Sequence, residues 1–302
     1  MRAFNFTKVL LCFVMMNWAV TLIRAQSIDL RSELIALVNS ELAFSKAALD
    51  KGMHAAFLTF LAERSIVFRP QPVDGRSFYS DGRDSVVLSW YPVVADISRT
   101  ADLGYTTGPY EARSTMPGGA QSVEHGYYVS LWSKQKDGTW KVVLDVGIGN
   151  YNLSPKTRPI PWQPPASYQP AFDQPVSNAQ DQREELMKMD QQCTAISRTK
   201  DAAVAYAALL AEDARLYKRW GEPIVGKLRI LASVSRKEIL RWKPLGADAA
   251  RGADLGYTYG KCTDLAALGH GYYARIWKRD KAGKWKIVLE IVTPSGAVEI
   301  AK

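Results

Sequence analysis

Two of the three histidines in this 302-residue chain occur in one repeated phrase. His125 begins the stretch HGYYVSLW, and His270 begins HGYYARIW. A histidine titrates near neutral pH, so these two are the sharpest candidates for general acid–base chemistry. The alternative is that each ring anchors a strand through one hydrogen bond, with Asp102 or Asp254 in a position to orient it. We favour the anchor, because no nucleophile or base accompanies either histidine at a fixed spacing.

A repeated set of aromatic and cationic residues could instead line a pocket for a small molecule. Such sites are usually apolar, with a few polar groups that orient the ligand. The alternatives are that the rings form core and that the cations form surface or ion-paired charges. The ligand-binding candidates are Arg69, Trp90, Tyr105, Tyr127, Trp132, Lys218, Trp242, Tyr257, Tyr272 and Trp277.

The sequence argues against several other chemistries. We expect no metal, because no cluster of histidine, cysteine and carboxylate has ligand spacing. We expect no cofactor either, since no glycine-rich phosphate loop and no hydrolase elbow is present. His54 has Ala203 as its counterpart in the repeat, so it receives no role. Cys193 and Cys262 could form a disulfide or remain thiols, and the sequence leaves both alternatives open.

The repeated phrase belongs to a tandem duplication that covers most of the chain. The stretch ADLGYT at Ala101–Thr106 returns at Ala253–Thr258, and DGTWKVVLD from Asp137 returns as AGKWKIVLE from Ala282. Order and spacing are kept, apart from short insertions. We therefore predict two domains, at residues 27–150 and 179–302.

A linker at residues 151–178 joins the two predicted domains. It holds seven of the 15 prolines, a density that excludes regular helix and favours an extended spacer. Trp162, Tyr168 and Phe172 indicate that the linker lies against a domain. We expect the two copies to pair within the chain, in a pseudo-two-fold arrangement.

Each copy begins with helical periodicity. Apolar residues fall on one stripe at residues 30–42 and again at 186–196. A break at Asp50–Gly52, or at Thr199–Asp201, precedes a second helix in each copy.

The closing part of each copy has a period of two. Residues 140–146 and 285–291 alternate as strands do, and Asp137-Gly138 and Ala282-Gly283 mark hairpin turns before them. Helices followed by an antiparallel sheet predict an α+β fold with two tandem cone-shaped domains, in which each curved sheet wraps around its N-terminal helices.

Residues 1–25 have the features of a secretory signal peptide. A positive start, a short apolar run and Ala25 before a cleavage site predict removal of this segment and export to the periplasm or medium. We expect no stable membrane insertion afterwards. The leader holds three of the 39 basic residues, so 36 remain against 30 acidic residues, a net charge of +6. The charges of both signs are interleaved, which argues against a nucleic-acid partner.

The motifs resemble a known family. The predicted helix pair, a Gly-Arg or Gly-Lys before a third helix (Gly82-Arg83 and Gly226-Lys227), the strand DLGYT and the closing hairpin are similar to the domain of unknown function 4440. That family belongs to the nuclear transport factor 2-like, or ketosteroid-isomerase-like and SnoaL-like, superfamily. The resemblance covers nearly all of both copies and implies a cone with an internal pocket, but no particular reaction.

The isomerase residues of that superfamily are missing here. Its steroid isomerases use an Asp base, a Tyr and a protonated Asp. The resemblance places Arg69 and Lys218 at the base position, and a guanidinium cannot abstract a proton. Neither first helix contains a tyrosine, and Tyr127-Tyr128 and Tyr272-Tyr273 stand where the protonated acid is expected.

We therefore expect an exported, non-catalytic protein that binds a small apolar or anionic molecule in the cone. One alternative is an isomerase- or lyase-like enzyme that uses His125 or His270. The other is a protein-interaction module that uses the sheet faces.

Overall fold

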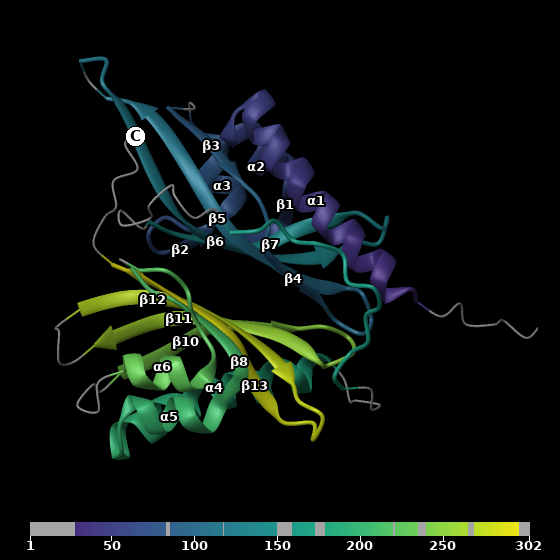
Figure 1. Ribbon diagram of the computed structural model, residues 1–302, viewed down its shortest axis with the longest axis vertical. Coiled ribbons are helices and arrows are strands. Elements are labelled where there is room, and N and C mark those ends of the chain that lie inside the picture. The colour runs from purple at the N-terminus through teal and green to yellow at the C-terminus, as the bar shows by residue number, and fades with distance from the viewer. Residues whose placement is uncertain are drawn as a thin grey trace, which may run out of the picture.

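The computed structural model describes residues 28–82, 85–116, 118–149, 159–172, 179–219, 221–234, 240–264 and 269–295. The predicted signal peptide, residues 1–25, lies outside them. Two sheets face each other across the middle of the molecule, and helices cover the outer side of each (Figure 1). No helix in the described ranges is long and apolar enough to cross a membrane.

The first copy forms a seven-stranded sheet with order β2-β1-β7-β6-β5-β3, in which β4 also pairs with β5. Only β1 and β7 run parallel; the other neighbours are antiparallel. Its elements are α1 (Leu30–Lys51), α2 (Met53–Phe60), β1 (Leu61–Phe68), β2 (Pro72–Asp74), α3 (Gly75–Ser80), β3 (Val86–Trp90), β4 (Val94–Ile97), β5 (Leu103–Thr115), β6 (Gln121–Lys134) and β7 (Trp140–Gly149).

The second copy repeats this arrangement in a six-stranded sheet with order β10-β11-β12-β13-β8-β9. The predicted α+β fold, with two tandem domains of helices packed against a curved sheet, is confirmed. Its elements are α4 (Ala179–Thr199), α5 (Ala202–Leu209), β8 (Leu210–Tyr217), β9 (Ile224–Val225), α6 (Lys227–Ser233), β10 (Leu240–Ala249), β11 (Leu255–Asp264), β12 (Gly269–Arg279) and β13 (Trp285–Pro294).

Local sequence signals fix most of the element boundaries. The side chain of Asp29 caps α1, and Gly52 ends it with a φ of 87° that favours glycine. The predicted hairpin turns are confirmed, with Gly138 at φ 85° and Gly283 at φ 74°.

The predicted start of the third helix is right in one copy and wrong in the other. In copy two, α6 follows Gly226 directly. In copy one, α3 begins at Gly75, after the cap Asp74, and Gly82 follows the helix. The Gly-Arg pair that matches Gly226-Lys227 is therefore Gly75-Arg76, where the Asp74 carboxylate satisfies the Ser77 amide at 2.7 Å.

The first helix of each copy protects the free edge of its sheet. Ser45 on α1 donates to the Trp90 carbonyl at 2.7 Å and accepts from the Trp90 amide at 3.2 Å. Thr194 on α4 makes the same two bonds to Trp242, at 2.6 Å and 2.8 Å. These contacts remove backbone groups with which another strand could pair.

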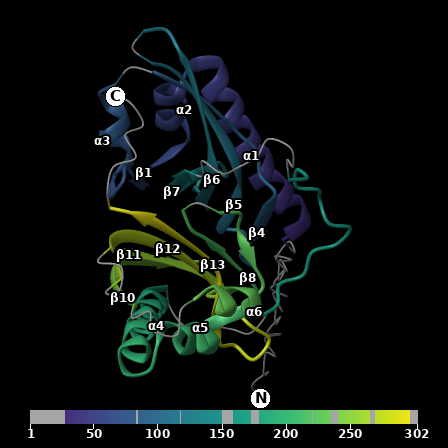
Figure 2. The same ribbon diagram turned by 60° about the vertical axis from the view of Figure 1, so that its left-hand side comes forward.

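The inner faces of the two sheets share one buried apolar cluster. Leu131 and Val146 of copy one lie in it together with Ile276 and Ile291 of copy two. Figure 2 shows the sheets facing each other between the two helical layers. The sheet-to-sheet contact therefore buries the face that the helices leave open.

Two equivalent turns meet where the sheets converge. The Arg99 amide donates to Asp254 at 2.9 Å, and the Arg251 amide donates to Asp102 at 3.0 Å. Ala101 and its counterpart Ala253 have φ angles of 50° and 51°. This reciprocal contact gives a structural reason for the repeated ADLGYT phrase.

The described part of the linker lies against the domains, as its aromatic residues predict. Tyr168 donates to the Ile97 carbonyl at 2.8 Å and also to the carboxylate of Asp96. Trp162 packs against the core of copy one. Phe172 lies against Arg279 of copy two, 5.8 Å from its guanidinium carbon.

Candidate functional site

The ten candidate ligand-binding residues lie on two different faces of the sheets. Side chains inside the cones, on the helix side, are those of Arg69, Trp90, Trp132, Trp242 and Trp277. Side chains on the faces between the copies are those of Tyr105, Tyr127, Tyr257 and Tyr272, whereas Lys218 is half-buried just after β8. The structure therefore does not bring the ten together in one site.

A buried carboxylate, Glu41, occupies the centre of the first cone. It accepts hydrogen bonds from the indole N–H groups of Trp90 and Trp132, the latter at 2.9 Å, and from the hydroxyl of Thr106. Burial raises the pKa of Glu41 to about 7, although these donors favour its ionised form. Donors thus occupy both carboxylate oxygens, which leaves Glu41 poorly placed to react with a ligand.

A second polar group in the first cone contains Arg69. Its guanidinium lies 3.3 Å from the Asp145 carboxylate and donates to the Tyr79 hydroxyl at 3.0 Å. Asp145 also accepts from Ser130 at 3.0 Å. Burial raises the pKa of Asp145, and the nearby Arg69 opposes that effect. Arg69 is therefore an internal ion-pair partner in this structure.

The second cone holds a fully buried arginine, Arg275. It pairs with Asp190 on α4 and with Glu290 on β13, the latter at 2.5 Å. Tyr273 donates to Asp190 at 3.0 Å, and Tyr206 donates to Glu290 at 2.6 Å. The guanidinium also lies 4.5 Å from the ring centre of Trp242. These contacts hold the buried guanidinium inside the cone.

The two copies place their internal cation at different positions, directly after β1 in copy one and on β12 in copy two. Arg275 stands in the repeated phrase where copy one has Ser130, whereas Arg69 stands where copy two has Lys218. The acid positions are shared, since Glu41 corresponds to Asp190 and Asp145 to Glu290. Sequence reasoning missed these groups. The sequence did contain a signal, because Asp145 and Glu290 each place an acid inside an otherwise apolar strand.

The two repeated histidines lie on the inner sheet faces beyond the shared cluster. His125 lies opposite Glu111, 3.9 Å from its carboxylate, and the exposed His270 lies 3.3 Å from the Thr263 hydroxyl. The suggested orienting residues, Asp102 and Asp254, lie at the other end of the strands and bind the turns between the copies. His125 thus has a carboxylate on the neighbouring strand, whereas His270 has a threonine hydroxyl at the equivalent position.

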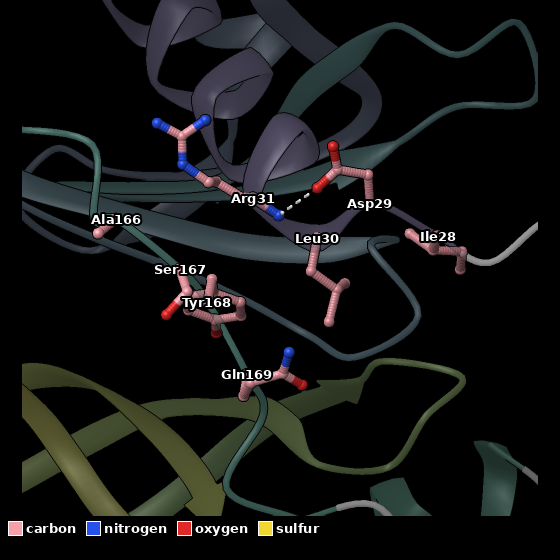
Figure 3. A pocket seen from close by; sticks show the side chains of 8 residues that line it. All are labelled: Ile28, Asp29, Leu30, Arg31, Ala166, Ser167, Tyr168 and Gln169. Atoms are coloured by element: carbon pink, nitrogen blue, oxygen red, sulfur yellow. Dashed lines mark hydrogen bonds between the residues drawn. The ribbon is translucent and has the colours of Figure 1, made fainter.

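One cavity, of about 300 Å³, lies where α1 begins. Residues 28–31 form one wall and linker residues 166–169 the other (Figure 3). The carboxylate of Asp29 points to the helix start and accepts from the Arg31 amide at 3.1 Å. Because this cap already supplies a negative charge to the helix terminus, the cavity is a poor site for an anion.

A larger cavity, of about 500 Å³, lies between the two copies. We call it the interdomain pocket. Copy one, the linker and copy two each contribute to its wall. Its lining residues are Val94, Ala95, Asp96, Tyr105, Ala171, Leu210, Ala211, Glu212, Asp213, Arg215, Val225, Lys227, Lys278, Arg279, Asp280, Lys286 and Val288.

Most cations of the interdomain pocket are already paired. Lys278 pairs with Asp96, Lys227 lies 3.0 Å from Glu212, and Arg279 lies 2.6 Å from Glu185.

Arg215 differs from these cations, because no salt bridge to it is found within the described ranges. Burial raises the pKa of the Tyr217 hydroxyl, and Thr107 and Arg215 beside it oppose that rise. Lys286 also lines the pocket without a salt bridge in the described residues, but its ammonium donates to the Ala208 carbonyl at 2.8 Å. Arg215 is thus the cation best placed to meet a ligand.

The cysteines and acids give no sign of a metal or disulfide site in the described residues. Cys193 and Cys262 are both buried, and no disulfide joins them; burial raises the pKa of Cys193 to about 12. No group of three or more histidine, cysteine or acidic side chains is arranged for a metal ion in those residues.

Comparison with known proteins finds solved structures of similar fold. A nuclear transport factor 2-like superfamily protein from Salmonella enterica is 12% identical, with 41% of this chain and 96% of that chain covered and a TM-score of 0.35. A ketosteroid isomerase-like protein from Erwinia carotovora is 12% identical, with 37% and 96% covered and a TM-score of 0.31. A nuclear transport factor 2-like protein of unknown function from Pseudomonas putida is 15% identical, with 42% and 95% covered and a TM-score of 0.34.

These descriptions name the superfamily that the sequence motifs resemble, and the likeness concerns the fold alone. No family model matches the chain, so the narrower resemblance to the domain of unknown function 4440 is not confirmed. No curated protein matches the chain.

Proposed function

We propose that the chain is an exported, non-catalytic binding protein that holds a small apolar anion in the interdomain pocket. The observation that carries this proposal is the position of Arg215 beside Tyr105 in a cavity of about 500 Å³. Apolar side chains of Val94, Leu210 and Val288 line the same cavity. Apolar side chains beside a cation that forms no salt bridge in the described residues suit a ligand that has both a hydrophobic body and a negative group.

The pocket between the copies is a better candidate than the cone interiors. Trp132, Trp277 and Arg275 are fully buried, and hydrogen bonds hold all three. Opening a cone for a ligand would expose its buried ion pairs. The ligand site that we propose is therefore not the cone pocket that the sequence predicts.

The enzyme alternative receives less support from the geometry. Neither His125 nor His270 lines either of the two cavities described above. The sheet faces that a protein-interaction module would use are largely buried against each other. We propose that this pairing of the copies persists in solution, since the pocket needs both of them.

Binding of anilinonaphthalene sulfonate, an apolar aromatic anion, tests the proposal by fluorescence titration. We expect saturable binding to the folded chain, which Arg215→Ala weakens by about tenfold, the scale of a lost charged contact. Arg229→Ala is the control, because Arg229 is exposed on α6 and does not line the pocket. Equal affinity in the wild type and Arg215→Ala would refute this site.

A further inference from the structure

Two lysines lie directly opposite each other on the second sheet. Lys243 on β10 pairs in register with Lys261 on β11, and Tyr272 on β12 follows in the same row. Residues in one row share a sheet face, and like charges directly opposite destabilise a sheet. The fold therefore tolerates an unfavourable pair on this face.

The next row extends the positive charge. Arg241 lies opposite Thr263, which lies opposite His270. Arg241, Lys243 and Lys261 are all exposed, and none of the three has an ion pair within the part of the chain that the structure describes. We call these three cations, with His270, the basic face.

The duplication supplies an internal comparison. At the positions of Lys243 and Lys261 copy one has Tyr91 and Pro109, and at those of Arg241 and Thr263 it has Ser89 and Glu111. Copy one thus has the same sheet and the same histidine without the cations. The basic face is a feature of copy two and not a requirement of the fold.

Copy one covers the tyrosines beside the basic face. The ring of Phe68 lies edge-on to Tyr259 and to Tyr272, with 6.5 Å between ring centres in each case. The Tyr272 hydroxyl lies 3.4 Å from the Gln71 side chain. A binding partner with a flat surface would therefore collide with copy one beside the basic face. Because copy one covers the rings of Tyr259 and Tyr272, these rings are poor platforms on which a nucleic-acid base could stack.

We propose that the basic face binds an acidic polysaccharide chain. Its recognition is electrostatic, and the chain lies along β10, where Arg241 and Lys243 are about 6.8 Å apart at the rise of a strand. A narrow linear polyanion fits beside the copy-one segment that holds Phe68 and Gln71. Its negative charge would relieve the repulsion between Lys243 and Lys261. This site is separate from the interdomain pocket and does not depend on it.

The test is binding of a fluorescent heparin oligosaccharide, measured by anisotropy at several salt concentrations. We expect the double variant Lys243→Gln/Lys261→Gln to bind about tenfold more weakly, with a salt slope reduced by about one to two charges. The control is Lys136→Gln/Lys188→Gln, which removes the same charge from exposed lysines elsewhere. We expect less than a twofold effect from the control.

A thermal melt checks that the double variant Lys243→Gln/Lys261→Gln is folded. Because the substitutions remove two opposed like charges, we expect the double variant to melt at the same temperature as the wild type or higher. An equal loss of heparin binding in the two double variants would overturn the proposal, because net charge alone would explain it. Tighter, lysine-dependent binding of oligothymidylate or of phosphatidylserine vesicles would overturn the choice of a polysaccharide.

Discussion

Removal of Arg275 tests the internal ion pairs of the second cone. The side chain is fully buried between Asp190 and Glu290. Substitution by Met keeps most of the volume but leaves two buried carboxyls without their cation, which costs about 3–5 kcal/mol of unfolding free energy. Arg229→Met is the control, and it should stay within about 0.5 kcal/mol because Arg229 is exposed.

The loss caused by Arg275→Met should depend on pH. Burial raises the pKa of Asp190 even with the arginine present. Without Arg275 the folded state binds protons more tightly than the unfolded state, so stability is retained at acid pH and lost as the pH rises. We expect a larger destabilisation at pH 8 than at pH 5.

Hydrogen exchange resolves the effect by domain, which a single melting curve of a two-domain chain does not. We expect faster exchange in β12 and β13 of the variant, with little change in β6. Adding Asp190→Asn and Glu290→Gln to Arg275→Met should recover most of the lost unfolding free energy. The amide oxygens that these substitutions introduce can still accept hydrogen bonds from Tyr273 and Tyr206. Unchanged β12 protection, or equal losses at the two pH values, would refute the reasoning.

Two further predictions concern the first cone and the turns. Burial raises the pKa of Glu41 to about 7, so ionisation of this carboxyl should lower the unfolding free energy by roughly 3 kcal/mol as the pH rises from 4.5 to 7. In urea titrations, Glu41→Gln should remove this dependence of the unfolding free energy on pH. Asp102→Ala removes bonds to Arg251 and Ser98, so we expect a loss of about 1–3 kcal/mol in a urea titration. Small-angle scattering of Asp102→Ala should stay compact; two freely tumbling lobes would contradict the proposed pairing.

Sequence patterns predict the elements of this fold better than its contacts. The repeat and the change of period predict both helix pairs and the closing hairpins, because these depend on local backbone preferences. The alternation of buried and exposed residues that is typical of strands is absent from β5, where the first six residues from Leu103 onward are all buried. Helices cover one face there and the other copy covers the second, so alternation cannot show which face holds Tyr105 and which holds Trp132.

The site could not be predicted for a related reason. The residues of the interdomain pocket come from β4, β5, the linker, β8, β9, α6, β12 and β13, and no single stretch of sequence carries their pattern. The buried acids were more accessible to sequence reasoning. Asp145 and Glu290 occupy the same place in two apolar strands, and an unpaired carboxylate there is too costly to keep, so each implies a buried cation.

The fusion of the copies has a physical consequence for function. In a dimer of identical chains every substitution appears in both halves, so a pair of opposed lysines or a buried arginine must suit both. Here Arg275 pairs with acids in one cone while Arg69 pairs with an acid in the other, and the counterparts of Lys243 and Lys261 in copy one are Tyr91 and Pro109. The interdomain pocket is also asymmetric, because Tyr105 comes from one copy and Arg215 from the other. Duplication thus kept the paired sheets while each half acquired charges that a symmetric dimer would have to carry twice.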